Sequence, residues 1–406
     1  MSESLRFNGC NADRRRARVQ ERRSQPDRPF GREELEGLMD EVFGGEVQAQ
    51  RLASLTAGVD GVLPAASLGV RAIGQGLAVA QGLAPRHAIK HVDRLRSNPQ
   101  RSMEQVFGCG VPFVVGERRE IVVNFDWTEF EDADQCTVVL GMQTEHGRST
   151  PLVWKTVTRS ELKDQRNDHE DDLLVVLASV VPKHVRVTVV ADRGCSDRTR
   201  YRFLTEALGV DDSIRSRGVV SVEDAVGARR TAKEWLGTAG RMPVLRQAWV
   251  TAPRHVVPRV VGVQDKARQE PWCLVSRRQD LTGVAIKVAD GRRVTVEETF
   301  RDVQNPRLGL GLPPAVIDRH DRRDALFLLA VLAHTLLTWL GQAGQELGRD
   351  RLLGAPRPGH RSRFRQGLRL FALLPKRRED RLRALAKPFG AWLQEPALFA
   401  GMLGVM

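Results

Sequence analysis

The sequence lacks the patterns that mark secreted and metal-stapled proteins. Its five cysteines are scattered, odd in number and without a CxxC pair, so they indicate neither a disulfide framework nor a zinc knuckle, and a reducing compartment suits them best. The arginine-rich N-terminus has no apolar stretch after it, which argues against a secretory signal. No internal repeat is present either.

A membrane-spanning run is also missing. The longest apolar segment, residues 325–340 (ALFLLAVLAHTLLTWL), contains His334 and two threonines and falls short of the roughly 20 apolar residues that a bilayer helix needs. We therefore expect a core helix that is buried on most sides, in a protein that has no membrane partner.

Positive charge is concentrated towards the two ends of the chain. The protein has 63 Lys and Arg against 50 Asp and Glu, a net charge of +13. Residues 1–32 contribute +5 and residues 349–387 contribute +10, so the remainder has a net charge of −2. Such flanks suit a polyanionic partner whose phosphates they would contact, although solubility alone also explains them.

The order of predicted elements indicates an α/β fold. Residues 33–98 look helical, and Pro85 can open a helix with a basic face that includes Arg86 and Lys90. After Gly116 the pattern changes to three strands at hairpin spacing, then helix, strand and helix. This is the order of an RNase H-like core, a mixed sheet flanked by helices. The predicted strands are 120–130, 137–143, 151–157 and 185–191, and the predicted helices are 171–181 and 198–208.

A second β-rich stretch interrupts this core. Residues 218–286 are predicted to form a separate insertion, with strands near 247–252, 256–263 and 272–276. Helices resume near residue 291 and dominate to the end of the chain.

Two acidic residues stand at the ends of predicted strands. Asp126 follows the apolar run of EIVVNFDWTEF, and Asp192 follows that of VRVTVVA. Carboxylates at the ends of neighbouring strands would project into one cleft, where their repulsion raises the pKa of at least one of them unless a cation lies between them. Mg²⁺ suits this position because it binds carboxylate and phosphate oxygens. Either aspartate alone is more simply a turn or capping residue, but the matching contexts favour a shared site.

A third acid falls on a predicted helix. Asp290, Arg293, Glu297 and Gln304 recur at spacings that put them on one face of one helix. That face would present Glu297 to a metal ion and Arg293 to a phosphate. The spacing fits a surface ion pair between Arg293 and Glu297 equally well, worth about 0.2–0.5 kcal/mol, so both interpretations stay open.

Six blocks of the sequence resemble, in order, the insertion-sequence transposases of group four, whose Asp-Asp-Glu (DDE) triad lies on an RNase H-like core. NFDWTEF, VVADRGCSD and VTVEETFRDVQNPRLGLGL resemble the three catalytic blocks. The other blocks are PRHAIKHVDRLRSN, EPWCLVSR, and the apolar helix with its RSRFRQGLRL tail. Together the blocks cover about residues 33–375.

The resemblance implies a triad of Asp126, Asp192 and Glu297 that binds two Mg²⁺ ions, for which Mn²⁺ can substitute. The implied reaction is cut-and-paste transposition, in which DNA is cleaved at the element's end and the freed 3′-hydroxyl attacks target DNA. The implied partners are duplex DNA, as transposon ends and target, and a second copy of the chain in a synaptic homodimer. The implied location is the bacterial cytoplasm, at the nucleoid.

The resemblance also suggests DNA contacts. Arg293 matches the arginine of the family's Tyr-Arg-Glu-Lys signature, which contacts phosphates near the transposon end. Trp272 stands where relatives place a tryptophan that stacks on a flipped base during hairpin formation, and a core strand tryptophan is the other interpretation. The remaining candidates are basic residues of the matching blocks: Arg193, Arg301, Arg86 and Lys90.

Two signature positions differ from the family. The tyrosine position is Asp290 and the lysine position is Gln304. Because an acid near a DNA backbone repels it, these changes predict weaker end binding or activity unless Arg292 or Arg307 substitutes. Two other functions therefore stay open: an RNase H-like nuclease that cleaves without joining, and a degenerate copy that only binds DNA.

Six regions follow from the predicted elements and the resemblance. They are a basic flexible arm (1–32), a helical N-terminal DNA-binding domain (33–115), the first part of the core (116–217), the β-rich insertion (218–286), the second part of the core with the helix of Glu297 (287–345), and a basic helical C-terminal region (346–406).

Overall fold

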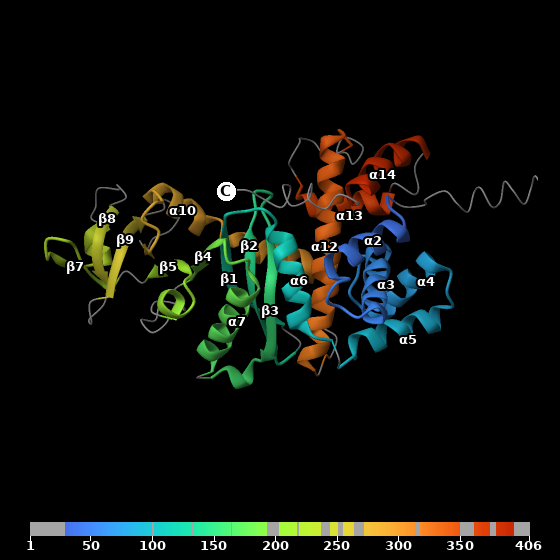
Figure 1. Ribbon diagram of the computed structural model, residues 1–406, viewed down its shortest axis with the longest axis horizontal. Coiled ribbons are helices and arrows are strands. Elements are labelled where there is room, and N and C mark those ends of the chain that lie inside the picture. Colours follow the sequence, from blue (N-terminus) through green and yellow to red (C-terminus); the bar gives the residue numbers. More distant parts are fainter. Residues whose placement is uncertain are drawn as a thin grey trace, which may run out of the picture.

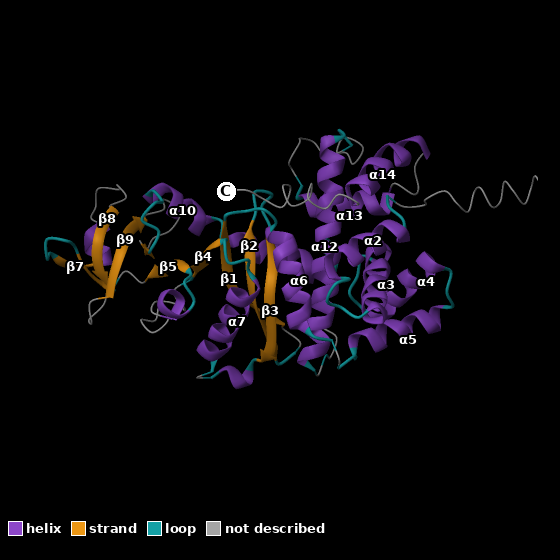
Figure 2. Cartoon of the chain, viewed as in Figure 1, coloured by secondary structure: helices purple, strands orange, loops and turns teal. Residues whose placement is uncertain are grey.

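A computed structural model shows a mixed α/β protein built on one ten-stranded sheet (Figure 1). The strand order is β3-β2-β1-β4-β5-β10-β9-β8-β6-β7. Figure 2 shows the strands in the middle and at one end, with helices gathered at the other end. The structure describes residues 29–99, 101–130, 133–163, 165–192, 203–216, 219–236, 244–250, 255–263, 272–312, 317, 319–349, 361–373 and 379–393. Nearly all of the predicted N-terminal arm lies outside these residues.

The two predicted aspartates lie in, or directly after, strands among the first five in this order. β1 (Glu120–Phe130), β2 (Gln135–Gln143) and β3 (Ser149–Thr158) form the predicted antiparallel meander. β4 (Arg186–Ala191) pairs with β1 in parallel, and β5 (Asp211–Ser216) pairs with β4 in parallel. All residues of β4 after the first are buried, as expected for a β-branched run at the centre of a sheet.

The insertion continues this sheet instead of forming a separate one. β10 (Trp272–Ser276) pairs antiparallel with β5 and with β9 (His255–Val263), which pairs with β8 (Val244–Val250). The small strands β6 (Ser221–Glu223) and β7 (Arg229–Thr231) complete the edge. The three predicted strands are confirmed. Their predicted separation from the core is not observed, because β5 joins β4 directly to β10.

Among the described residues, five helices precede the sheet; the first four lie at the opposite end of the molecule from the insertion, and the fifth lies beside β3 (Figure 1). The helix predicted from Pro85 is present, with the proline in the first turn, where its missing N–H costs nothing. The helices are α2 (Arg32–Phe43), α3 (Ala49–Ala65), α4 (Val70–Gln81), α5 (Pro85–Arg96) and α6 (Met103–Val115).

Helices cover both faces of the half of the sheet that contains β1–β4. α7 (Arg166–Val180) packs on β2 and β3 from one face, and α11 (Val294–Gln304) packs on β1, β2 and β3. α10 (Gly283–Gly291) leads into α11. The shorter helical segments are a 3₁₀ turn at Ser160–Leu162, a π-helical turn at Phe203–Ala207 and α9 (Ala232–Leu236). The first part of the helix predicted at 198–208 lies outside the described residues.

The apolar segment predicted as a core helix belongs to α12 (His320–Glu346). Among the described residues, α12 is long and apolar enough to cross a membrane. However, 78% of its most apolar 18-residue stretch is buried inside the protein. It packs against α13 (Arg363–Leu373), β3 and α3, and α14 (Glu379–Leu393) follows α13. Its polar residues His334 and Thr338 are buried as well, so the helix forms part of the protein core.

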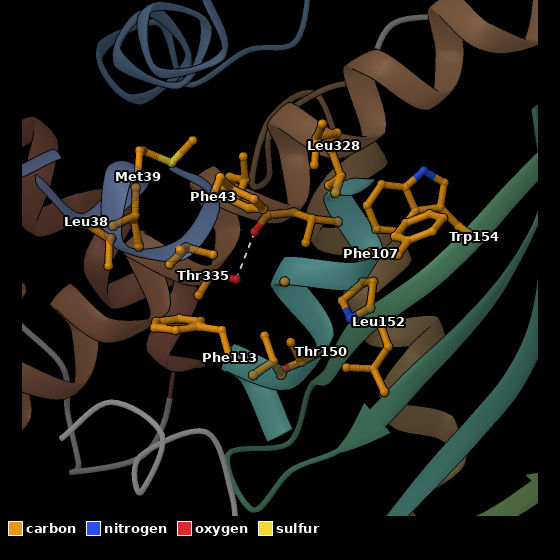
Figure 3. A pocket seen from close by; sticks show the side chains of 18 of the residues that line it. Leu38, Met39, Phe43, Phe107, Phe113, Thr150, Leu152, Trp154, Leu328 and Thr335 are labelled. Atoms are coloured by element: carbon orange, nitrogen blue, oxygen red, sulfur yellow. Dashed lines mark hydrogen bonds between the residues drawn. The ribbon is translucent and has the colours of Figure 1, made fainter. Parts of the chain in front are cut away.

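A small apolar cavity of about 70 Å³ lies where the N-terminal helices meet the sheet (Figure 3). Its wall includes Phe43 of α2, Phe113 of α6 and Leu152 of β3. Thr335 of α12 donates its hydroxyl to the main-chain oxygen of Val331 at 2.9 Å, so this hydroxyl is satisfied within its own helix. Because its wall is almost wholly apolar, the cavity offers a water molecule few hydrogen-bond partners.

The crossing of α12 and α13 depends on glycine. A Cβ atom on Gly367 would overlap the main-chain oxygen of Leu337, and one on Gly341 would overlap that of Arg363. By contrast, a Cβ on Gly110, which lines the apolar cavity, would meet the ring of Phe43 at an ordinary 3.7 Å.

We expect Gly367→Ala to destabilise the protein by about 2 kcal/mol or more, because the two helix backbones would have to separate. Gly110→Ala should instead stabilise it by about 0.5–1 kcal/mol, since alanine is the better helix former and has room here. Midpoints of urea unfolding measure both changes. A neutral Gly367→Ala or a destabilised Gly110→Ala would contradict this packing.

Candidate active site

Strand pairing brings the two aspartates to the same level of the sheet. Asp126 lies in β1, and Asp192 directly follows β4. The parallel register pairs Asn124 with Val190, so two residues further along each strand Asp126 is level with Asp192. Because neighbouring strands are about 4.8 Å apart and side chains two residues apart share a face, both carboxylates project from the same face and edge.

The guanidinium of Arg293 joins all three predicted acids. Its Nη1 lies 3.6 Å from Asp126 Oδ2, and its Nη2 lies 3.6 Å from Asp192 Oδ2 and 3.9 Å from Glu297 Oε1. The structure thus brings together the carboxylates from β1, the end of β4 and α11, which are far apart in the sequence. Arg293 is the residue around which they meet.

Burial differs within this cluster. The side chain of Asp126 is 23% exposed, whereas those of Asp192 and Glu297 are 49% and 42% exposed. Burial raises the pKa of Asp126, and the charges of Glu297 and Asp192 raise it further, while Arg293 and the Trp127 amide act in the opposite direction. The site is therefore closed at Asp126 and open to solvent at the other two acids.

The donor set fits a hard divalent cation by its chemistry, because three carboxylates offer only oxygen ligands. The spacing is wider than in a loaded metal site: among the described residues, no group of three acidic, His or Cys side chains is close enough together to hold an ion. Mg²⁺ ligands lie at about 2.0–2.1 Å, so a metal between these acids requires the Arg293 side chain to leave the centre of the cluster.

A break between two helices positions Arg293 and Glu297. α10 ends at Gly291 and α11 begins at Val294, so Arg293 stands at the N-terminus of α11. The sequence predicted one helix with Asp290, Arg293, Glu297 and Gln304 on one face. This prediction is wrong for Asp290, which lies on α10, before the break. Arg293 and Glu297 remain one turn apart, which is why both reach the aspartates.

Buried amides fix this break to the sheet. Asn124 Nδ2 donates to Thr295 Oγ1 at 3.1 Å and to the main-chain oxygen of Arg292 at 3.4 Å. Gln143 Nε2 donates to Asn124 Oδ1 at 2.6 Å and to the main-chain oxygen of Ala289 at 2.8 Å. Sequence reasoning missed both amides. A polar Asn124 inside an apolar strand, two residues before Asp126, was the available signal.

The two signature positions that differ from the family lie in different surroundings. Asp290 belongs to α10, is 4% exposed and pairs with Arg215 of β5 at 2.6 Å. The expectation that its charge faces DNA beside Arg293 is thus corrected, because its partner is inside the protein. Gln304 does lie near the site, and its amide donates to Thr128 Oγ1 of β1 at 2.9 Å.

The face of β1 opposite the acids has its own polar contacts. Trp127 donates its indole N–H to Glu170 Oε1 of α7 at 2.7 Å, and Arg166 lies over its ring at 5.0 Å. These contacts were not predicted. They lock the strand residue next to Asp126 against α7, and so help to hold the acid's direction.

Three other predicted DNA contacts, Arg301, Arg86 and Lys90, do not join the three acids. Arg301 is exposed on α11 and pairs with Glu298. Arg86 and Lys90 are exposed on α5, which packs on α3, α4 and α12 in the N-terminal helical region. Trp272 begins β10, and its backbone pairs with Val263; its side chain lies outside what the structure describes, as does the whole of Arg193.

The geometry described above is the evidence for this candidate site. No family model and no curated protein matches the sequence. The transposase family therefore stays a prediction from the resemblance.

We expect Asp126→Asn to stabilise the protein at neutral pH. Because the folded state raises the pKa of Asp126, ionisation is penalised on folding. The penalty is absent below the unfolded-state pKa of about 3.9, grows as the pH rises towards the folded-state pKa, and is constant above it. Urea unfolding between pH 4 and 8 should show a gain that increases with pH and then levels off. Glu129→Gln, at an exposed position of the same strand, is the control, and a pH-independent or negative difference for Asp126→Asn would contradict the electrostatics described.

Proposed function

We propose that this protein is a DNA transposase of the DDE type, which cleaves DNA and joins the freed 3′ end to target DNA with the aid of Mg²⁺. The observation that carries the proposal is the meeting of Asp126, Asp192 and Glu297 around Arg293. Two of these acids come from neighbouring parallel strands and the third from a helix over them, as the resemblance implies for the triad.

The sheet supports an RNase H-like core. The order β3-β2-β1-β4-β5, with an antiparallel meander followed by two parallel strands, agrees with the core expected from the sequence. The aspartates lie at one edge of its two central strands, where polar side chains can reach a ligand outside the sheet. The insertion after β5 also agrees with the order of blocks in the resemblance.

Each residue has a distinct role in this proposal. Asp126, Asp192 and Glu297 would hold two Mg²⁺ ions, or Mn²⁺ in their place. When bound, such ions supply an activated attacking oxygen and neutralise charge on the leaving one. Arg293, released from the carboxylates, would bind a phosphate of the DNA, because its planar guanidinium matches phosphate oxygens. The partly buried Asp126 fixes the position of the site, while the exposed acids leave room for a DNA strand.

The degenerate-copy alternative loses part of its basis. It rested on an acid at position 290 facing the DNA, but this acid is neutralised by Arg215. The proposed partner is duplex DNA, in keeping with the net charge of +13, and a synaptic homodimer at the bacterial nucleoid is part of the proposal. A nuclease that cannot join ends remains the alternative that experiment must separate.

We expect the purified protein to nick duplex DNA taken from the borders of its own coding region, in Mg²⁺ or Mn²⁺ and not in EDTA. Glu297→Gln should reduce nicking at least about a hundredfold, because a metal ligand is lost. Glu298→Gln, its neighbour on α11 that pairs with Arg148 and Arg301, is the matched control and should retain activity. Equal activity of the two variants would remove the triad assignment.

Joining is tested separately with precut ends that carry a free 3′-hydroxyl and a supercoiled plasmid as target. A transposase gives joined products that disappear with Asp192→Asn. Nicking without any joined product would instead identify a nuclease, and DNA binding without nicking would identify a degenerate copy.

Metal binding should also appear as stability. If Mg²⁺ is present at ten times its dissociation constant, the folded state gains about 1.4 kcal/mol, which raises Tm by roughly 1.5–2 °C for a chain of 406 residues. We expect this shift for the wild-type protein and its loss in Asp192→Asn. Differential scanning fluorimetry at matched ionic strength, with Na⁺ replacing Mg²⁺, measures it, and equal shifts in both proteins would count against a shared metal site.

A further inference from the structure

A second, strongly basic cavity lies apart from the triad. It has a volume of about 890 Å³ and is open to solvent. The turn between β2 and β3, the segment after α11, the end of α12 and the start of α13 form its wall. Its acidic lining residue is Glu145, whereas six arginines line it: Arg148, Arg307, Arg361, Arg363, Arg365 and Arg369.

Asp302 of α11 lies behind this basic wall and pairs with two of its arginines. Its side chain is fully buried and contacts Arg148 Nε at 2.5 Å, His334 Nε2 at 3.6 Å and Arg365 Nε at 3.7 Å. Burial alone would raise the pKa of Asp302, but the neighbouring His334 and Arg148 outweigh it and lower the pKa. One carboxylate thus contacts basic side chains from three separate segments of the chain. These contacts fix the positions of the segments that form the cavity wall.

The cavity keeps a positive excess after this pairing. Arg148 is also 3.7 Å from Glu298, so its charge is satisfied inside the protein. Arg307 and Arg369 are exposed at the wall. α13 also begins here, with Ser362 Oγ accepting from the Arg365 amide at 3.3 Å, and the helix N-terminus adds partial positive charge.

The lining favours a phosphodiester backbone over a free nucleotide. Among the described residues of the wall, the apolar ones are Leu308 and Leu368, and the one aromatic ring is the imidazole of His146. Burial lowers the pKa of His146 to about 3, so this ring is neutral at pH 7. Because the described residues of the lining include no Tyr, Trp or Phe, a base finds little stacking surface there, whereas several arginines in a row suit successive phosphates.

We propose that this cavity is a second DNA-binding site, which holds backbone phosphates of duplex DNA away from the triad. The identity of the partner as DNA rests on the proposed function. α11 links the two places, because it carries Glu297 and ends at Gln304, three residues before Arg307. One DNA molecule could therefore contact both places.

The test compares two double variants that lose the same charge. Arg307→Gln/Arg369→Gln removes two exposed arginines of the cavity. Lys163→Gln/Lys183→Gln removes two exposed lysines beside α7, on the opposite face of the sheet from α11. Affinity for a labelled 30-base-pair duplex is measured by fluorescence anisotropy at 50–200 mM NaCl in EDTA, so catalysis is not involved.

Two lost phosphate contacts should reduce the slope of log affinity against log salt by about 1.8, and should weaken binding about ten- to sixtyfold at 0.1 M salt. The lysine pair should change neither. Unchanged affinity and slope in the arginine pair, or an equal loss in both pairs, would overturn the second site. If the slope falls but the wild-type protein neither nicks nor joins DNA, the second site stands and the proposed enzyme function fails.

Discussion

One guanidinium among three carboxylates is the interaction on which the candidate site depends. Asp126, Asp192 and Glu297 would repel one another if they shared this space alone, and Arg293 supplies the cation that lets them meet. One positive charge does not balance three negative ones, so the cluster retains an affinity for further cations. Arg293 therefore favours the metal-free arrangement, and the proposed divalent ion would compete with it for the same oxygens.

α11 converts this charge cluster into a fixed geometry. Thr295 and Thr299 are bonded to the sheet, through Asn124 and through the main chain of Ser149. The opposite side of the helix presents Glu297 to the aspartates. A helix anchored along its buried side cannot rotate without breaking these bonds, so the position of the third acid is set by packing against β1 and β3.

The sequence predicts features that depend on neighbouring residues better than features that depend on residues far apart in the chain. β1, β4, the helix that starts at Pro85 and the core helix have strong apolar patterns or clear end signals, and all of them are present. β5 was missed because its sequence, DDSIRS, is polar, although Asp212 and Arg215 are buried. The break before Arg293 and the pairing of Asp290 depend on residues distant in sequence, namely Asn124, Gln143 and Arg215, which no periodicity reveals.

The polar character of β5 has a structural reason. Burial raises the pKa of Asp212 to about 7, and such a residue is tolerated because Arg277 lies 3.7 Å away, just beyond β10. Arg215 of the same strand pairs with Asp290 of α10. A slip of one residue between β5 and β10 would move these charges away from their partners, so the ion pairs specify one register. Because α10 leads directly into Arg293, the register that aligns the insertion with the core also determines where α11 begins.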